Sequence, residues 1–296
     1  MDKNENRIYH VLTHWGFSAI EIKEQFNRSS SRLIYRVTGD GEELLLKGIP
    51  DSKPEEAIKG NVSAHKYLGN EKHIAPNIIK MPAGSLYLKE SGYWFYLMEY
   101  IKGRAMKENI SDEYSIGKLT RQLHSHRDYP YKSSLNEDPA RFYQWFKDKE
   151  FKADFDKIIS NLPDFSKYDR CFIHTDIGPH NAMVGNNGQA LFIDLDDAGI
   201  GSRYLDLGWP FIMQFVDFNH NTGEMNYRFD LAKSFLRGYY GNDLISPEEY
   251  DLLWQGATYM HISYMKSYGP EAVDSLWNIL KFGMEQKDKL YVRLKL

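Results

Sequence analysis

Short apolar runs separated by polar turns dominate the first hundred residues. Residues 32–37 and 43–49 are β-rich, and the Asp-Gly pair at 40–41 between them is typical of a tight hairpin turn. Residues 85–100 repeat the pattern, with a Ser-Gly turn at 91–92. This alternation predicts a β-rich first lobe that is complete near residue 100.

From Ser52 the apolar positions change to a helical period. Ser52 and Glu55 have the spacing of a capping box, and Pro54 suits the first turn of a helix. Four positions then recur on one face: Ala57, Asn61, Ala64 and Leu68. The pattern predicts a helix of about four turns that packs against the sheet.

Beyond residue 104 the apolar positions fall three and four apart, and the chain is mainly helical to its end. Residues 170–194 interrupt this pattern with short β-rich runs and an Asn-Gly turn at 187–188. We therefore predict an α+β chain of two lobes. The small β-rich N-terminal lobe would span 1–101, and the larger, mainly helical C-terminal lobe 102–296.

The bulk composition is that of an ordinary globular protein. The 296 residues are 42% hydrophobic and 26% charged, with a formal net charge of -4, so the chain lacks the basic surface used to bind nucleic acid. A single cysteine, Cys171, excludes an internal disulfide framework. The polar N-terminus and the absence of a long apolar run argue against a signal peptide and a membrane helix. We expect a cytoplasmic protein, while its oligomeric state stays open.

Residues 171–199 hold the densest group of acids, amides and histidines in the chain. His174, Asp176 and Asn181 follow the spacing H-x-D-x-x-x-x-N, and Asp194 comes thirteen residues after Asn181. In phosphoryl transfer, one carboxylate accepts the proton of the attacking hydroxyl, while an amide and a second carboxylate hold Mg²⁺ against the phosphates. Because Mg²⁺ prefers oxygen ligands and keeps several waters, one Asn and one Asp suffice. The spacing therefore predicts a phosphoryl-transfer site.

Three segments in this order, "IHTD....N", "FIDLDDAGIG" and "YLDLGW", resemble the catalytic core of the aminoglycoside phosphotransferase and choline kinase superfamily. Its fold is similar to that of protein kinases. The resemblance implies ATP and Mg²⁺ as cofactors, Asp176 as the catalytic base, and Asn181 and Asp194 as the metal ligands. Asp206, in "YLDLG", corresponds to a position that supports the catalytic loop. Asp196 would take part in the metal site or lie next to it.

The chain departs from the family pattern within the catalytic loop. Thr175 stands where family members commonly have glycine, and His180 is displaced relative to the usual D-x-H-P-x-N. The spacing of Asp176 and Asn181 is retained. For His180 we favour a loop histidine that fills space over one that contacts substrate or phosphate.

The first lobe offers the residues that a nucleotide requires. Ser29 and Ser30 lie in "NRSSSRLIYRV", a small polar turn whose backbone N–H groups are suited to phosphate. Lys47 interrupts the apolar run "ELLLKGI", and a buried ammonium needs an anion. It is our candidate for the phosphate-binding lysine. "FYLMEYIKG" resembles the interlobe hinge, in which the C=O of Glu99 and the N–H of Ile101 would bind adenine.

The usual partner of such a lysine, a glutamate on the following helix, is missing. Asn61 occupies the position where the family has this glutamate, and Glu55 and Glu56 lie nearer the start of the helix. Capping and the helix dipole explain both glutamates without a lysine. The sequence leaves the partner of Lys47 open among these three residues.

The resemblance implies a phosphotransferase that moves the γ-phosphate of ATP to a hydroxyl of a small molecule. The acceptor would be an aminoglycoside, choline or ethanolamine, homoserine or a sugar-like molecule. Two alternatives remain, a protein Ser/Thr kinase of the same superfamily and a catalytically weak, nucleotide-binding pseudokinase. Reading "IDLDDA" as the D-x-D of a phosphatase or a glycosyltransferase explains less, and the spacing of His174 and His180 matches no zinc helix.

Overall fold

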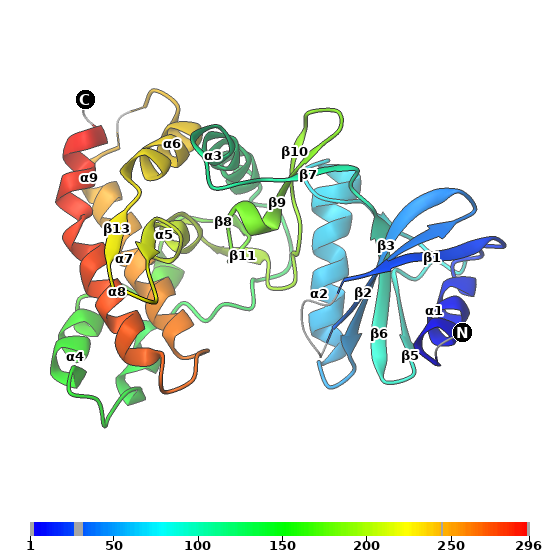
Figure 1. Ribbon diagram of the computed structural model, residues 1–296, viewed down its shortest axis with the longest axis horizontal. Helices are drawn as coiled ribbons and strands as arrows, with labels where there is room; N and C mark the ends of the chain where they lie inside the picture. The colour runs from blue at the N-terminus through cyan, green and yellow to red at the C-terminus, as the bar shows by residue number, and fades with distance from the viewer. Residues whose placement is uncertain (1–2, 27–31, 244, 295–296) are drawn as a thin grey trace. The chain divides into compact units, whose positions relative to one another are not determined.

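The computed structural model describes residues 3–26, 32–243 and 245–294 (Figure 1). The chain divides into two compact units. The first comprises Met1–Arg104 and Met183–Asp197, and the second comprises Ala105–Ala182 and Ala198–Leu296. The chain thus returns to the first unit for fifteen residues that include Asp194 and Asp196. The assignment of a nucleotide-binding lobe to 1–101 and a catalytic lobe to 102–296 stays a prediction.

The first unit is built on an antiparallel sheet whose described strands run in the order β1-β2-β3-β6-β4, with β5 also paired to β6. The strands are β1 (Ile20–Gln25), β2 (Leu33–Gly39), β3 (Glu42–Pro50), β4 (Ile78–Ile79), β5 (Tyr87–Glu90) and β6 (Tyr93–Glu99). The predicted hairpin turns are confirmed. Asp40 and Gly41 have φ of 48° and 89°, and Ser91 and Gly92 have φ of 50° and 83°, the left-handed values that tight hairpin turns require.

A helix covers each face of this sheet (Figure 1). On one face, α1 (Lys3–Thr13) and the loop after it bury Ile8, Val11 and Trp15 against Leu44 and Leu46 of β3. The other face packs α2 (Glu55–His65) and a π-helical continuation (Lys66–Glu71) against a second apolar cluster. Alternate residues of β3 therefore face different helices.

The predicted capping box at the start of α2 is wrong. Pro54 is the N-cap residue, and no side chain caps the helix there. The backbone turns before the helix, where the Lys53 N–H donates to the Pro50 C=O (3.1 Å). Glu55 instead accepts a hydrogen bond from the Tyr87 hydroxyl (2.6 Å). A tertiary contact thus replaces the local one.

A further sheet, in the order β10-β9-β7, follows the first. It consists of β7 (Gly103–Ala105), β9 (Ala182–Gly185) and β10 (Ala190–Phe192), with Gly188 at φ 79° in the turn between the last two. The predicted hairpin around the Asn-Gly pair is therefore confirmed. The Phe192 N–H donates to the Ile74 C=O (2.9 Å), which fixes the strand that leads to Asp194 within the first unit.

The second unit is mainly helical. Its described helices are α3 (Ile110–His124), α4 (Lys152–Ser160), α5 (Arg203–Met213), α6 (Phe229–Tyr240), α7 (Pro247–Met265), α8 (Val273–Glu285) and α9 (Lys287–Leu294). Two small strand pairs accompany them, β8 (Arg170–Ile173) with β11 (Gly199–Ser202), and β12 (Val216–Phe218) with β13 (Met225–Tyr227). Short 3₁₀ turns occupy Pro139–Gln144, Phe165–Lys167 and Pro179–Asn181.

Close helix packing in the second unit depends on glycine. A Cβ at Gly256 of α7 would overlap the Tyr204 backbone oxygen, and one at Gly208 of α5 would overlap the backbone of α7 near Ala257. The two helices therefore touch backbone to backbone. This contact fixes α5, which carries Asp206. None of the described helices is long and apolar enough to cross a membrane.

Candidate functional site

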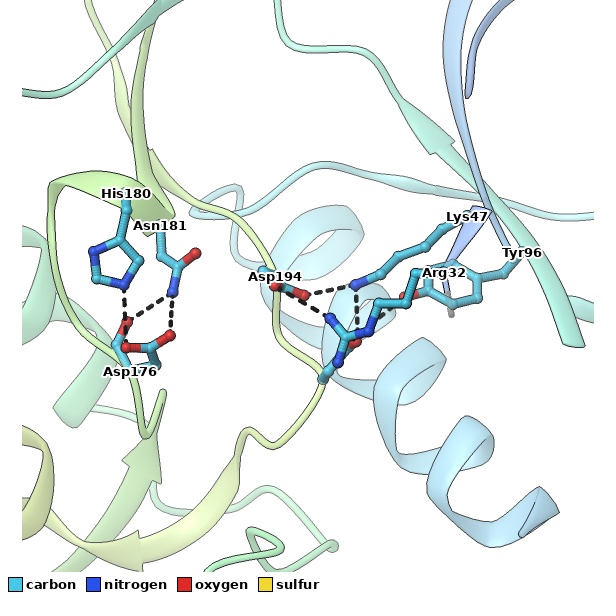
Figure 2. A network of polar contacts seen from close by, with 8 residues as sticks. Arg32, Lys47, Tyr96, Asp176, His180, Asn181 and Asp194 are labelled. Atoms are coloured by element: carbon cyan, nitrogen blue, oxygen red, sulfur yellow. Dashed lines mark hydrogen bonds and ion pairs between the residues drawn. The ribbon is translucent and has the colours of Figure 1, made fainter. Parts of the chain in front are cut away.

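Lys47 of β3 is the centre of a buried ion-pair network in the first unit (Figure 2). Its Nζ donates to Asp194 Oδ1 at 2.6 Å and to Asp196 Oδ1 at 2.7 Å. The side chains of Lys47 and Asp196 are 5% and 7% exposed, whereas that of Asp194 is 36% exposed. The two acids therefore differ. Asp196 is a buried partner of the lysine, and Asp194 is accessible to a ligand.

Tyr96 and Arg32 complete this network. The Tyr96 hydroxyl donates to Asp196 Oδ1 (3.1 Å), and Arg32 Nη1 lies 3.2 Å from Asp196 Oδ2. Burial by itself would lower the pKa of Lys47, but Tyr96 and the carboxylates of Asp196 and Asp194 raise that pKa above its ordinary value. The lysine is therefore cationic. Neither Tyr96 nor Arg32 was among the predicted site residues, because neither belongs to a local motif.

None of the three candidate partners from the sequence pairs with Lys47. Glu55 and Glu56 form ion pairs with Lys59, and Asn61 acts indirectly. With its amide oriented to satisfy its surroundings, Asn61 Nδ2 donates to the backbone oxygens of Asp196 (2.5 Å) and Ala57 (2.9 Å). The residue at the glutamate position thus holds the backbone of the acid that pairs with the lysine.

Asp194 lies just beyond the end of β10, in the left-handed backbone region. Its φ is 60°, a value uncommon for residues other than glycine and a sign of local strain that the surrounding fold must support. The Asp196 backbone two residues later is held by Asn61. This conformation directs Asp194 and Asp196 toward the same ammonium group, although alternate residues of a regular strand point to opposite faces.

The other nucleotide-binding candidates of the first unit are only partly described. Ser29 and Ser30 lie outside the described residues. Glu99 is the last residue of β6, and Ile101 follows two residues later. Among the described residues, no hydrogen bond is formed by the Ile101 N–H, so this donor is available for a ligand such as an adenine base.

Asp176 of the second unit is held by two neighbours on its own loop (Figure 2). Asn181 Nδ2 donates to its Oδ2 and to its backbone oxygen, both at 2.9 Å, and His180 Nε2 lies 3.1 Å from its Oδ1. Burial would raise the pKa of Asp176, but the hydrogen bond and charge of His180, together with His174 and Asn181, hold that pKa below its ordinary value. His180 thus orients Asp176, a role more specific than the predicted space-filling one.

The backbone before Asp176 is fixed by Asp206 of α5. This fully buried carboxylate accepts the N–H of His174 (2.6 Å) and of Thr175 (2.5 Å), and it lies 3.1 Å from His124 Nε2. Thr175 adopts φ 77°, a strained value for a β-branched residue. This explains the glycine that family members commonly have there. Asp206 stabilises the strained turn, in agreement with the supporting role that the resemblance implied.

Two groups of side chains next to this loop were not among the predicted site residues. Burial and the Tyr268 hydroxyl raise the pKa of the Tyr264 phenol, and the charge of Asp176 adds to this effect. The Tyr264 ring packs edge-on against Trp209 at 5.3 Å. Gln214 Oε1 lies beside Gly178, and Gln214 Nε2 donates to the buried Glu113. Five other aromatic residues of the second unit are buried in its core and are not available to an acceptor: Tyr227, Tyr239, Trp254, Tyr259 and Trp277.

The donor set of the two predicted metal ligands fits Mg²⁺. Asn181 directs its amide nitrogen to Asp176, and within the described part of the chain no donor occupies its Oδ1. That carbonyl oxygen, together with the accessible carboxylate of Asp194, is the hard-oxygen type of ligand that Mg²⁺ prefers. Asn181 and Asp194 belong to different units, so their joint binding of one ion stays a prediction.

Comparison with known proteins gives one family and a common fold. A model of the phosphotransferase enzyme family matches residues 24–244. No curated protein sequence gives a significant match. Among solved structures, a microcompartment-associated aminopropanol kinase is 15% identical with a TM-score of 0.69, and 99% of this chain and 100% of that chain are covered.

Two further structures share the fold. An ethanolamine kinase from Plasmodium vivax is 15% identical with a TM-score of 0.62, covering 96% of this chain and 89% of that chain. A spectinomycin phosphotransferase in complex with ADP and spectinomycin is 14% identical with a TM-score of 0.55, covering 98% and 93%. At such low identity these likenesses concern the fold alone. They confirm the predicted α+β, kinase-like class.

Proposed function

Because this chain belongs to the phosphotransferase enzyme family, we propose that it transfers the γ-phosphate of ATP to the hydroxyl of a small amine-bearing molecule. The fixed geometry of Asp176 is the observation that supports this most directly. Its carboxylate is oriented by His180 and Asn181 and is still partly accessible. Such a group can accept a hydrogen bond from an alcohol and aim its oxygen at a phosphorus atom.

In the proposed reaction Asp176 serves mainly to position the hydroxyl. Its pKa is lowered by His180 against the effect of burial, so the carboxylate is a weak base toward an unactivated alcohol. Phosphoryl transfer tolerates this, because the new P–O bond is barely formed in its loose transition state and the hydroxyl proton needs to leave only late, as that bond forms. The proton then passes to an Asp176 oxygen as the new P–O bond forms and the bond to ADP breaks.

The phosphates are proposed to bind Lys47, and the metal is proposed to bind Asp194 of the ion-pair network and Asn181 of the second unit. Lys47 would bind the α- and β-phosphates, and Asp194 and Asn181 would hold Mg²⁺. When bound, the metal neutralises charge on the phosphate oxygens. Lys47 is cationic and fixed by Asp196, which supports a lysine prepared in place for an anionic ligand.

Asp196 takes the part of the missing helix glutamate in this proposal. It is the more buried acid partner of Lys47. It also accepts a hydrogen bond from the Tyr96 hydroxyl and forms an ion pair with Arg32. If Asp194 rotates from Lys47 to the metal, Asp196 still pairs with the buried ammonium group. An unpaired buried ammonium group would cost folding free energy.

The nucleotide is proposed to be ATP. The spectinomycin phosphotransferase of related fold contains ADP, and the unbonded Ile101 N–H with the Glu99 C=O offers the donor and acceptor that an adenine edge requires. Backbone N–H groups of Ser29 and Ser30 are proposed for the phosphates. Residues 1–101 would thus bind nucleotide and 102–296 would supply Asp176 and the acceptor site, in the cytoplasm where ATP is available.

An amine-bearing acceptor is supported by chemistry near Asp176. Aminopropanol and ethanolamine, the substrates named for two proteins of related fold, each carry a hydroxyl and an amine. In this chain the partly exposed Tyr264 lies within electrostatic reach of Asp176 in the second unit, and aromatic faces attract ammonium groups. Among the acceptors expected from the sequence, small amino alcohols therefore agree best with this site.

A panel assay tests the proposed function. The protein is incubated with Mg²⁺·ATP and separate amino alcohols, aminoglycosides, homoserine and neutral sugars, and acceptor-dependent ADP is measured together with the phosphorylated product. We expect turnover with at least one amino alcohol and little with neutral sugars. ADP formation that is independent of every acceptor, or phosphorylation of protein substrates alone, would contradict the proposal.

A further inference from the structure

Three metal-ligating side chains meet on the surface of the first unit, apart from the ion-pair network around Lys47. His10 and His14 belong to α1 and the residue after it, and Glu90 ends β5. One ligand atom from each residue lies within 4.8 Å of those of the other two. The three residues come from segments about eighty positions apart, so the fold itself brings them together.

The spacing of the histidines suits a shared metal. Residues four apart on a helix lie on one face, and the two imidazole rings are 5.4 Å apart at an interplanar angle of 80°. Within the described residues neither imidazole forms a hydrogen bond, so both rings keep a nitrogen lone pair for a ligand. Edge-on rings with free nitrogens can turn toward one ion without breaking an existing bond.

The carboxylate is oriented as metal ligands commonly are. The Ser91 hydroxyl donates to Glu90 Oε1 at 2.9 Å, and such outer contacts fix the ligand that they hold. The histidines lie at the C-terminal end of α1, where the helix dipole favours a cation. Both histidines are exposed and Glu90 is partly exposed, so an ion can reach the site and water can complete its coordination.

We propose that His10, His14 and Glu90 form a binding site for a divalent transition metal of the Zn²⁺ type. Two imidazoles and one carboxylate are a common Zn²⁺ ligand set, with water as the fourth ligand. Ligand distances near 2.1 Å place tetrahedral donor atoms about 3.4 Å apart. The ligand atoms now lie within 4.8 Å of one another, and rotation of the exposed histidine side chains would bring them to that spacing. Two imidazole ligands disfavour Mg²⁺ at this site, since Mg²⁺ prefers ligands that are all oxygen.

A bound ion would link α1 to the edge of the main sheet. Figure 1 shows α1 beside β5, and α1 already packs its apolar face on the sheet through Ile8 and Val11. The metal would add a second, polar attachment at the end of the helix. Its effect would be on the stability of the first unit, independent of phosphoryl transfer.

Calorimetric titration of ZnCl₂ into the full chain without an affinity tag or nucleotide tests this site. The test variants are His14→Ala and Glu90→Gln, and the matched controls are His220→Ala and Glu42→Gln, two exposed residues elsewhere. We expect one Zn²⁺ per chain and a Zn²⁺-dependent rise in melting temperature. Each test variant should weaken binding by at least about tenfold, because losing a residue that only supports a metal ligand already costs about that much, while both controls should bind like the wild type.

Two outcomes would overturn the proposal. One is wild-type affinity in His14→Ala, with its unchanged melting temperature in the absence of Zn²⁺ showing that the variant is folded. The other is loss of Zn²⁺ binding in Asp194→Asn with full binding in His14→Ala, because the ion would then occupy the candidate phosphoryl-transfer site.

Discussion

Replacing Asp196 by asparagine tests whether this residue is the acid partner of Lys47. The substitution keeps the size of the side chain and removes its negative charge. In the structure Asp196 Oδ1 accepts from both Lys47 and Tyr96, and its side chain is only 7% exposed. The change therefore acts on a buried charge without creating a cavity.

The expected magnitude follows from these contacts. Removing one partner of a buried ion pair lowers the free energy of unfolding by about 3–5 kcal/mol, because the other charge stays buried and unpaired. Here the cost is smaller, because Asp194 remains 2.6 Å from Lys47 Nζ and the asparagine carbonyl still accepts a hydrogen bond. Asp194 must then serve both the lysine and the proposed metal. We expect nucleotide affinity to fall by about 10- to 100-fold, equivalent to about 1.4–2.8 kcal/mol.

Nucleotide binding measured by calorimetry with and without Mg²⁺ separates the two possible roles of Asp196. A lysine partner predicts weaker ATP binding in both conditions, because Lys47 is proposed to bind the phosphates directly. A metal ligand predicts weaker binding only when Mg²⁺ is present. The neighbouring exposed residue provides a control, and Asp197→Asn should bind ATP like the wild type. The double variant Asn61→Glu, Asp196→Asn places a carboxylate on α2 instead of at position 196. It should recover part of the lost ATP affinity.

Equal ATP affinity of the Asp196→Asn and Asp197→Asn variants would refute the assignment of Asp196 to Lys47. A loss confined to Mg²⁺-containing samples would refute it too, and would move Asp196 to the metal site.

Three further predictions concern stability. Thr175 has φ 77°, a conformation that costs a non-glycine residue about 1–2 kcal/mol, and glycine itself carries a penalty of about 0.5–1 kcal/mol. We therefore expect Thr175→Gly to raise the free energy of unfolding by up to about 1.5 kcal/mol in denaturant unfolding, and marked destabilisation would contradict the strain. Gly256→Ala forces α5 and α7 apart and should lower the free energy of unfolding by about 1–3 kcal/mol. The control Gly60→Ala places a Cβ that meets nothing within 4 Å and should not lower it. Burial raises the pKa of Glu113 from 4.5 to about 8, so the folded state binds a proton that the unfolded state has lost between those values. Wild-type stability should therefore fall as pH rises through this window relative to Glu113→Gln, and parallel pH profiles of the two proteins would show that the pKa is not raised.

Local features of the sequence predicted much of the fold. The hairpin turns at Asp40-Gly41 and Ser91-Gly92 follow from residues that accept left-handed backbone, and the helical spacing around Asn61 follows from burial of one face. The family was also identified correctly, because its motifs lie within short segments. The capping box failed because Glu55 is engaged by Tyr87, a residue 32 positions away. Spacing alone carries no information on such competing contacts.

The candidate site shows the same division between local and distant contacts. Asp176, His180 and Asn181 lie within six residues, so their proximity was implicit in the motif. The partners of Lys47 lie 147 and 149 residues away. From the sequence, a partner was expected only on the following helix, where the family has its glutamate. An asparagine at that position was the one available signal that another acid pairs with the lysine.

The strained residues could be anticipated only in part. The departure from glycine at Thr175 was visible, but its φ and the two hydrogen bonds that Asp206 provides were not. Arg32 and Tyr96 carry no motif, and their place in the network follows from strand pairing, since Tyr96 is opposite Lys47 in the register of β3 and β6. Side-chain networks across strands require the register to be known first.

The turnover of Asp176→Ala with an accepted amino alcohol tests the central claim most directly. Initial rates are measured at saturating Mg²⁺·ATP and acceptor, with ATP affinity determined separately by calorimetry. Loss of a group that positions and deprotonates the hydroxyl predicts a fall in kcat of about 10²- to 10⁴-fold, with ATP affinity essentially unchanged. Full turnover by Asp176→Ala would contradict the assignment of Asp176 as the residue that carries the reaction.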